Sequence, residues 1–317
     1  MLLEIRSFRN PDPPHILRLW EECKLGRGAA KGLTCDAFEF VVFGQPYFDP
    51  RGLMVAESDG RVVGFVHAGF GVNEGESGLA RENGVICAVM VHPDFRRQGI
   101  GRKLIAAAEE YLNQAGATNI VAGQSRQRDG FYLGIYGGSE LPGFLESDSN
   151  AAPFLTATGY QPLERRLVFQ KDIKTKQEPF DSRLAPIRRS MQLVVTDKPE
   201  RLTWWWVARC GRFDTFRFLL VPKNTPQPVA EVTCFGLDLY IRSWQQRCVG
   251  LTDLKVGEPG RRKCYAKALL LESFRRLREE MVTRVEVHTP ETNIAAVSLF
   301  KALRFELVDT GVVYQKR

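Results

Sequence analysis

One short segment of this 317-residue chain combines residues that could bind an anion: positions 91–104, VHPDFRRQGIGRKL. Two adjacent arginines, Arg96 and Arg97, are followed closely by two glycines, Gly99 and Gly101. Arginine supplies a positive charge whose geometry suits phosphate, and glycine lets an anion approach the backbone without a Cβ in the way. The segment is therefore a candidate phosphate-binding loop. The simpler alternative is a solvated basic turn.

The segment lies between a predicted strand and a predicted helix. An apolar run that ends at Val91 precedes it, and a helix-like run over 101–115 follows it and stops at Gly116. Such a junction leaves the first amides of the helix unpaired at the positive end of the helix dipole, so an anion is their natural partner. The sequence lacks both the Walker pattern and the dinucleotide fingerprint, which excludes two other kinds of phosphate loop.

The elements around this loop follow a regular order in the first half of the chain. We expect a strand at 2–8, a helix with Asp12 as its N-cap, a short helix at 36–43, a hairpin over 52–71 turning at 58–60, a polar loop at 72–83, strands at 84–91 and 119–122, a helix at 151–158 and a strand at 166–170. Residues 130–150 interrupt this order with a segment rich in glycine and aromatic residues that shows no clear period. Long segments of this kind are functional or mobile.

The order of elements restarts after a polar segment, 171–190, whose charges and two prolines are typical of a linker. We expect a helix at 198–210, strands at 214–221, 228–235 and 249–256, a helix at 265–281, a strand at 283–288, a helix at 293–303 and a strand at 305–315. Residues 91–104 align without a gap with 256–269, VGEPGRRKCYAKAL, so that Arg96-Arg97 matches Arg261-Arg262. Two similar domains are the simplest explanation.

Composition narrows the class of protein. The net charge of +7 favours an anionic partner, but the basic residues are scattered, which fits a phosphorylated small ligand better than nucleic acid. The 7 cysteines and 4 histidines show no metal-ligand spacing, so we expect neither a disulfide framework nor a metal site. No apolar stretch reaches the ~18 residues of a membrane span, and the N-terminus does not read as a signal peptide. We expect a cytoplasmic protein without a membrane partner; its oligomeric state stays open.

The pattern Val91-x-Pro93-x-x-Arg96-Arg97-x-Gly99-Ile100-Gly101 resembles the acetyl-CoA-binding signature of the GNAT superfamily of N-acetyltransferases, R/Q-x-x-G-x-G/A. The order of elements and the helix ending at Gly159-Tyr160 are similar to that family, and so is the segment that runs from Asn293 to Phe305. The chain therefore resembles a tandem GNAT protein. The resemblance implies an α/β (α+β) fold of two GNAT-like domains, each a mixed, mostly antiparallel twisted sheet flanked by helices, with a first domain at 1–172, a linker at 173–190 and a second domain at 191–317.

The resemblance also implies an activity, the acetyl-CoA-dependent transfer of an acetyl group to a primary amine of a small molecule or peptide. Acetyl-CoA is then the co-substrate, and no metal is needed. The amides of Gln98 to Arg102 would hold the pyrophosphate, and the end of the preceding strand would pair with the pantetheine arm. The implied cofactor-binding residues are Met90, Val91, Arg96, Arg97, Gln98, Gly99, Ile100, Gly101 and Arg102.

Acetyl transfer to an amine needs a base for the ammonium and an acid for the leaving thiolate. Family members often place a tyrosine acid at a position that corresponds here to Leu155, which cannot donate a proton. The candidates for catalysis are therefore Tyr132, Tyr136 and Glu140, with Tyr160, Glu74, Glu76 and Glu146 as alternatives and a water chain as another. The 130–150 segment is also our candidate for substrate recognition, because its aromatics and carboxylates suit a cationic amine; a packed covering loop is the alternative.

The second copy of the loop departs from the pattern. Cys264 stands where the first loop has Gly99, and its Cβ and sulfur would crowd a pyrophosphate. We therefore expect the second domain to be degenerate and the active site to lie in the first. A different class of function remains open, a CoA-binding regulatory or scaffold protein without turnover, because Leu155 replaces the expected acid. Nucleic-acid binding would require a steep salt dependence of affinity.

Overall fold

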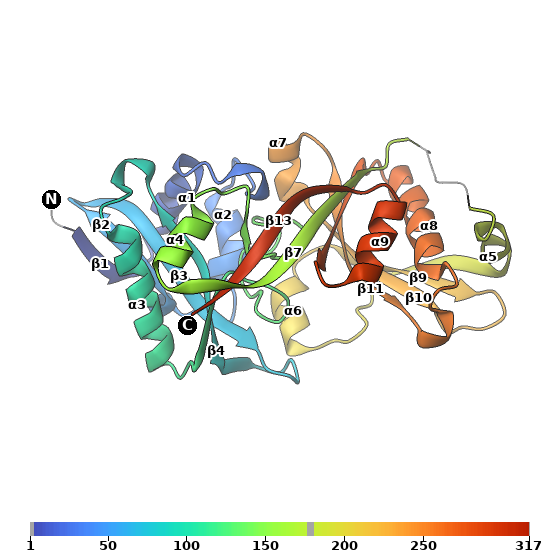
Figure 1. The fold of residues 1–317 in the computed structure, drawn as a ribbon, viewed down its shortest axis with the longest axis horizontal. Helices are drawn as coiled ribbons and strands as arrows, with labels where there is room; N and C mark the ends of the chain where they lie inside the picture. Colours follow the sequence, from blue (N-terminus) through green and yellow to red (C-terminus); the bar gives the residue numbers. More distant parts are fainter. Residues whose placement is uncertain (1–2, 176–180, 317) are drawn as a thin grey trace.

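The computed structural model describes residues 3–175 and 181–316. Figure 1 shows two halves side by side, with long strands crossing between them. The strands of the N-terminal half are β1 (Leu3–Ser7), β2 (Leu53–Ser58), β3 (Arg61–Val72), β4 (Leu79–Val91), β5 (Asn119–Ala122), β6 (Phe144–Leu145) and β7 (Tyr160–Asp172). Its helices are α1 (Pro13–Glu22), α2 (Cys35–Phe38), α3 (Ile100–Gln114) and α4 (Ala151–Ala157).

The C-terminal half repeats this plan in the part of the chain that the structure describes. Its strands are β8 (Met191–Thr196), β9 (Thr215–Pro222), β10 (Ala230–Gly236), β11 (Cys248–Val256), β12 (Arg284–Pro290) and β13 (Glu306–Lys316). Its helices are α5 (Leu184–Ser190), α6 (Trp204–Cys210), α7 (Ile241–Trp244), α8 (Tyr265–Glu279) and α9 (Ile294–Ala302). The predicted fold class, two GNAT-like α/β domains with mostly antiparallel sheets, is confirmed.

Alternation along the strands places helices on both faces of the N-terminal sheet. On β2, Leu53 and Val55 pack into a core with α1 and α2, whereas Met54 and Ala56 pack into a second core with α3 and α4. This is the period of 2 that a strand imposes on its side chains. The 130–150 segment packs into the first core, because Phe131 and Tyr132 are buried among the α1 and α2 residues.

Strands β4 and β5 pair in parallel over only four residues of each strand, Asn83–Ile86 with Asn119–Ala122. A bulge in β4 follows at Cys87, since His67 pairs with Ala88 while Ala68 pairs with Ile86. Beyond this bulge β4 continues to Val91 while β5 ends at Ala122. The edge of β4 from Ala88 onward therefore carries no ladder to β5 in the described structure. On that edge the Val91 carbonyl accepts a hydrogen bond from Arg96 Nε.

The two halves exchange their last strands. β13, the end of the chain, lies between β5 and β7, pairing Tyr314 with Ala122 on one side and Lys316 with Tyr160 on the other. β7 in turn pairs with β12 of the C-terminal half. A single sheet therefore runs in the order β1-β2-β3-β4-β5-β13-β7-β12-β11-β10-β9-β8 across the described residues. The predicted domain limits of 1–172 and 191–317 remain a proposal, but β13 completes the sheet of the first half.

The internal repeat is visible in the backbone. The aligned positions Gly99 and Cys264 are both left-handed N-cap residues, with φ of 80° and 62°, and each opens a helix of 15 residues. Arg97 and Arg262 are also left-handed, with φ of 63° and 61°. The second loop therefore keeps the conformation of the first, although its sequence replaces the glycine.

Several elements differ from the sequence-based expectations. The helix predicted at 198–210 begins only at Trp204, because the Thr203 hydroxyl caps it by accepting a hydrogen bond from Trp206 N. The loop predicted at 72–83 is shorter, since β4 begins at Leu79. Asp12 takes the N-cap position of α1, but its carboxylate accepts hydrogen bonds from Arg6 and from Arg9 N instead of capping the helix.

The predicted linker is structured in part. Its end forms helix α5, and the strand β8 that follows immediately was not expected. Residues 176–180 of the linker lie outside the described residues.

Candidate functional site

A groove of about 450 Å³ opens beside the loop that the sequence singles out. Its walls come from the end of β4, the loop, the start of α3, and α4 with the segment before it. We call it the loop groove, and it is lined by Cys23, Leu25, Val89, Met90, Val91, Phe95, Arg96, Arg97, Gly99, Gly101, Arg102, Phe144, Asp148, Ser149, Asn150, Ala151, Pro153, Phe154, Leu155 and Ala157. Of the nine predicted cofactor-binding residues, Gln98 and Ile100 are not in this lining. Gln98 is exposed on the loop, and the Ile100 side chain is buried in the core.

The backbone of the loop leaves an open site for an anion. Gly99 has a φ of 80°, a conformation that L side chains rarely adopt, and a Cβ built on it would meet no atom within 4 Å. Helix α3 begins at the next residue, Ile100. The amides of its first turn have no intrahelical acceptor, so they are available as donors at the positive end of the helix.

The second glycine of the motif serves a different purpose. A Cβ on Gly101 would lie 2.8 Å from Phe154 Cε2, so the missing side chain makes room for the aromatic ring of Phe154 on α4. Gly101 therefore brings α4 close to α3 and narrows the loop groove. The sequence alone treats both glycines as points of phosphate approach, whereas the structure gives that geometry to Gly99.

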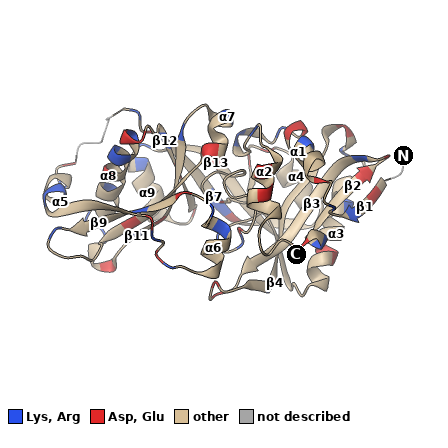
Figure 2. Ribbon diagram, turned by 180° about the vertical axis from the view of Figure 1, so that it is seen from behind, with Lys and Arg blue, Asp and Glu red and all other residues tan. Residues whose placement is uncertain are grey.

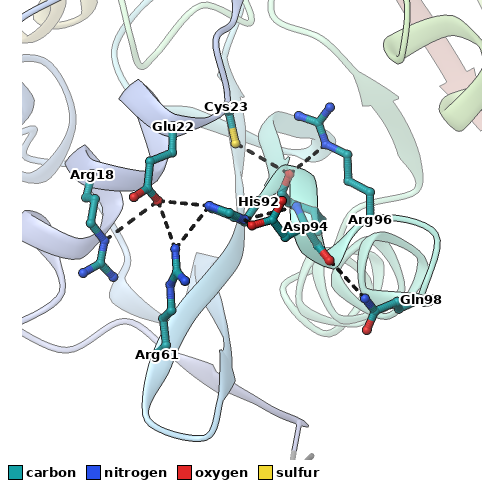
Figure 3. A network of polar contacts seen from close by, with 9 residues as sticks. Arg18, Glu22, Cys23, Arg61, His92, Asp94, Arg96 and Gln98 are labelled. Carbon is teal, nitrogen blue, oxygen red and sulfur yellow. Dashed lines mark hydrogen bonds and ion pairs between the residues drawn. The ribbon is translucent and has the colours of Figure 1, made fainter.

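The base of the loop is fixed by polar contacts, shown in Figure 3. Arg96 Nε donates a hydrogen bond of 3.0 Å to the carbonyl oxygen of Val91, which closes the loop on itself. His92 joins the loop to α1 and β3, because its Nε2 lies 3.4 Å from Glu22 Oε2 and 3.2 Å from Arg61 Nη2. The side chain of Arg96 is thus engaged within the loop, while Arg97 and Arg102 are exposed at its rim.

Leu155 lies in the loop groove, as its position in the pattern predicts, and it is fully buried. Its aliphatic side chain contributes shape and no proton. The groove also contains residues that sequence reasoning did not single out, among them Cys23, Asp148 and Asn150. Burial raises the pKa of the Cys23 thiol to about 11, so the thiol is protonated at neutral pH. These residues reach the groove from α1 and from the turn before α4, and their local sequence carries no signal of that position.

Tyr132 lies deep in the N-terminal core, outside the loop groove. Its side chain is 2% exposed, and its hydroxyl lies 3.0 Å from Nδ1 of His67, which is 1% exposed. The Trp20 ring stacks on Tyr132 with centroids 6.1 Å apart. Burial raises the pKa of Tyr132 and lowers the pKa of His67 to about 3, so both groups are neutral near pH 7.

His67 makes stability depend on pH. Its pKa falls from 6.5 to about 3 on folding, so its stabilising effect is complete above pH 6.5 and is lost as the pH falls toward 3. Between pH 6.5 and pH 3 the unfolded chain binds one more proton than the folded chain. We therefore expect the free energy of unfolding to fall by about 1.4 kcal/mol for each unit by which the pH is lowered. Urea unfolding at pH 5 and pH 7 measures the slope. His67→Asn should flatten it, and the same change at exposed His15 should not; an unchanged slope in His67→Asn contradicts the assignment.

The other candidates for catalysis lie apart from Tyr132 and have different hydrogen-bond partners. Tyr136 accepts a hydrogen bond of 3.3 Å from Leu145 N through its hydroxyl, and burial raises its pKa. Glu140 accepts a hydrogen bond of 2.6 Å from Arg166 and lines a second hollow, between the two halves. Tyr160 donates to Glu109 at 2.9 Å, and Glu146 pairs with Arg165 at 2.7 Å. The structure therefore does not bring Tyr132, Tyr136 and Glu140 into one site; their catalytic roles remain predictions.

The C-terminal half holds the 130–150 segment in place. Glu286 of β12 is fully buried and accepts hydrogen bonds from Ser139 N at 2.7 Å and Gln170 Nε2 at 2.5 Å, with His288 Nε2 at 3.2 Å. Burial raises the pKa of Glu286, but these donors outweigh it and keep the pKa below its usual value. Tyr240 makes a second contact with this segment, because its hydroxyl accepts a hydrogen bond of 3.0 Å from Gly138 N.

The start of helix α8, which follows the second loop, is paired with a carboxylate from another segment of the chain. Lys267, in the first turn of α8, forms an ion pair of 2.9 Å with Asp181, whose carboxylate is largely buried. Asp181 also pairs with Arg183 at 2.9 Å. A carboxylate of the connecting segment thus neutralises a cation at the start of the second helix, in a position that corresponds to exposed Arg102 of the first loop.

The described ranges, 3–175 and 181–316, contain no group of three or more His, Cys, Asp or Glu side chains that could hold a metal ion. They also contain no helix with the length and apolar character needed to cross a membrane. Figure 2 shows Lys and Arg spread over elements of both halves instead of forming a single track.

Known proteins match the first half of the chain. The sequence model of the Acetyltransferase (GNAT) family matches residues 14–134, which include the loop and most of α1 to β5. An acetyltransferase of Pectobacterium atrosepticum is 35% identical over 118 residues, which cover 37% of this chain and 73% of that protein. One from Sodalis glossinidius is 34% identical over 118 residues, 37% of this chain and 72% of that protein. The chain belongs to the GNAT family of acetyltransferases.

Solved GNAT structures extend the likeness to both halves. A tandem GNAT protein from the clavulanic acid biosynthesis pathway superposes with a TM-score of 0.68 at 18% identity, covering 99% of this chain and 98% of that chain. A GNAT of Sphaerobacter thermophilus gives a TM-score of 0.64 at 15% identity, covering 99% of this chain and 95% of that chain. Identities this low show the fold alone. The tandem GNAT arrangement predicted from the repeat is confirmed.

Proposed function

We propose that this GNAT is an acetyl-CoA-dependent N-acetyltransferase that acts on a primary amine, with its active site in the N-terminal half. The observation that carries the proposal is the loop groove. It combines an open left-handed Gly99, unpaired amides at the start of α3 and an edge of β4 that has lost its pairing with β5. These features fit a phosphorylated ligand with an extended arm, and CoA is such a ligand.

The residues proposed to hold the cofactor act mainly through their backbone. The amides of Gln98 to Arg102 donate to the pyrophosphate. The edge of β4 at Met90 and Val91, which β5 does not pair with, binds the pantetheine arm. Arg97 and Arg102 add charge at the rim. Arg96 shapes the loop through its hydrogen bond to the Val91 carbonyl. When bound, acetyl-CoA supplies a thioester whose acetyl group passes to the amine nitrogen, which loses a proton, while CoA leaves as a thiol.

The proton chemistry is assigned from the positions of the candidate side chains. Tyr132 is engaged in a buried hydrogen bond and Tyr136 in a partly buried one, so we assign them to positioning of the 130–150 segment. Glu140 lines the hollow between the halves, and we retain it as the candidate base for the ammonium. Leu155 supplies no acid, so the proton that the thiolate takes up comes from solvent in this proposal.

The first experiment tests turnover. The full chain is incubated with acetyl-CoA and a panel of primary amines, and free thiol is measured together with the mass of the product. We expect CoA release that depends on the amine and on the enzyme, with a product heavier than the amine by one acetyl group. Acetyl-CoA binding without release for any amine would contradict the proposal and support the alternative, a CoA-binding regulatory protein.

A further inference from the structure

A second hollow, of about 240 Å³, lies between the two halves of the molecule. We call it the central cleft. The 126–140 part of the first half forms one side, helix α6 forms another, and strands β9, β10 and β11 of the second half form the third. Its lining and that of the loop groove share no residue in the described chain. The 123–150 segment contributes to both, with Glu140 in the cleft and Phe144 in the groove.

Many charged side chains of the central cleft already have partners. Arg126 pairs with Asp253 at 2.5 Å, and Glu140 pairs with Arg166 at 2.6 Å. Lys255 pairs with Glu200 at the rim. These pairs are neutral overall, so the ring of charge around the cleft does not by itself select a ligand of either sign.

Asp129 also has an ionic partner, but only one of its two carboxylate oxygens is hydrogen-bonded. Its side chain lines the cleft yet the residue is only 4% exposed, and Oδ2 accepts a hydrogen bond from Arg209. Its other oxygen, Oδ1, is buried and has no hydrogen-bond partner among the described residues. Burial raises the pKa of Asp129, and the Arg209 guanidinium opposes this effect.

A buried carboxylate oxygen without a donor is unfavourable, because its desolvation is not compensated. A ligand that brings a donor to this oxygen recovers that free energy. An ammonium group can supply this donor, and the hydrogen bond is then charge-assisted on both sides.

The cleft also has apolar residues among its polar lining. They include Leu133, Trp206, Phe216 and Phe235. Aromatic walls of this kind bury the body of an apolar or aromatic ligand and orient it through its polar end. The cleft thus combines one acceptor for a cation with a surface for an uncharged body.

We propose that the central cleft binds the acceptor substrate as an amine with an apolar, aromatic body, whose ammonium pairs with Asp129 Oδ1. This inference rests on the proposed function and names the substrate class that the function leaves open. It also gives the C-terminal half a role, because β9, β10 and β11 supply one wall of the acceptor site.

The test compares two ligands of the same shape and opposite charge, phenethylamine and 3-phenylpropionate. Calorimetric titration of the full chain without acetyl-CoA measures both. We expect phenethylamine to bind at least tenfold more tightly, and we expect Asp129→Asn to remove this preference. Glu200→Gln, at the rim of the same cleft, should keep it. Equal binding of the two ligands by the native chain, or an unchanged preference in Asp129→Asn, would overturn the inference.

Two further measurements keep the result interpretable. Asp129→Asn leaves Arg209 with a weaker partner, so its melting temperature and acetyl-CoA affinity are measured beside the native chain. If the variant does not fold, Trp206→Ala takes its place: it should weaken both ligands while keeping the tenfold preference for the amine, and unchanged affinities would overturn the inference. Acetyl-CoA binding and turnover without amine selectivity would contradict this inference alone. Amine selectivity without acetyl-CoA binding would contradict the proposed function alone.

Discussion

Replacing Gly99 by glutamate lowers the affinity for acetyl-CoA by at least about 100-fold, or about 2.7 kcal/mol. The physical reason has two parts. Gly99 has a φ of 80° and open space where a Cβ would stand, so a side chain there enters the site and strains the backbone. The new carboxylate also faces the amides that would hold the pyrophosphate and repels the ligand. Isothermal titration of the native and variant chains with acetyl-CoA measures the change.

The internal repeat offers a matched control for this variant. Cys264 occupies the corresponding N-cap of α8 and has nearly the same backbone conformation, with a φ of 62°. Cys264→Glu should therefore leave the affinity for acetyl-CoA unchanged if the first loop holds the ligand. An equal loss in both variants would place a ligand at the second loop as well. Native affinity in Gly99→Glu would refute the proposed site.

Gly138→Ala destabilises the protein by about 3–5 kcal/mol, the range for disrupting a buried charge that depends on its partners. Gly138 has a φ of 98°, and a Cβ there would overlap Glu286 Oε1 and lie 2.7 Å from Glu286 Cδ. The carboxylate cannot move freely, because Ser139 and Gln170 hold it from two sides. Urea unfolding followed by circular dichroism measures the loss of stability.

Gly60→Ala is the control for backbone strain alone. Gly60 has a φ of 77°, and a Cβ there would meet no atom within 4 Å. We expect a loss of about 1–2 kcal/mol from the left-handed conformation. Gly138→Ala and Gly60→Ala could instead lower the free energy of unfolding by the same amount. The close packing of Gly138 against Glu286 would then not stabilise the contact between β12 and the 130–150 segment.

Much of the fold follows from local sequence. The hairpin β2–β3 turns at Asp59 and Gly60, both of which are left-handed, as the turn residues predict. The gapless alignment of 91–104 with 256–269 predicts two helices that begin at equivalent residues, and they do. These features depend on residues close in sequence, so turn chemistry, helix starts and hydrophobic period are sufficient to predict them.

The predictions were less accurate where a distant partner decides the conformation or role of a residue. The Asp12 carboxylate binds Arg6 and the Arg9 amide instead of the helix it precedes. Gly101 accommodates Phe154 of α4, more than fifty residues later. Asp129 meets Arg209 of the other half. No local pattern contains these partners, because they come together only when the sheet forms.

The sequence by itself determined the loop, its repeat and the family, because each of these is written in short runs of neighbouring residues. Only the tertiary structure decided where the last strand goes. β13 leaves its own half to lie between β5 and β7, with its backbone groups paired on both sides. The hydrogen bonds between strands are made by backbone groups that are the same in every sequence. The choice of a neighbouring strand therefore depends on how the side chains of the whole chain pack. The central cleft is likewise decided by the tertiary structure, because its walls come from both halves.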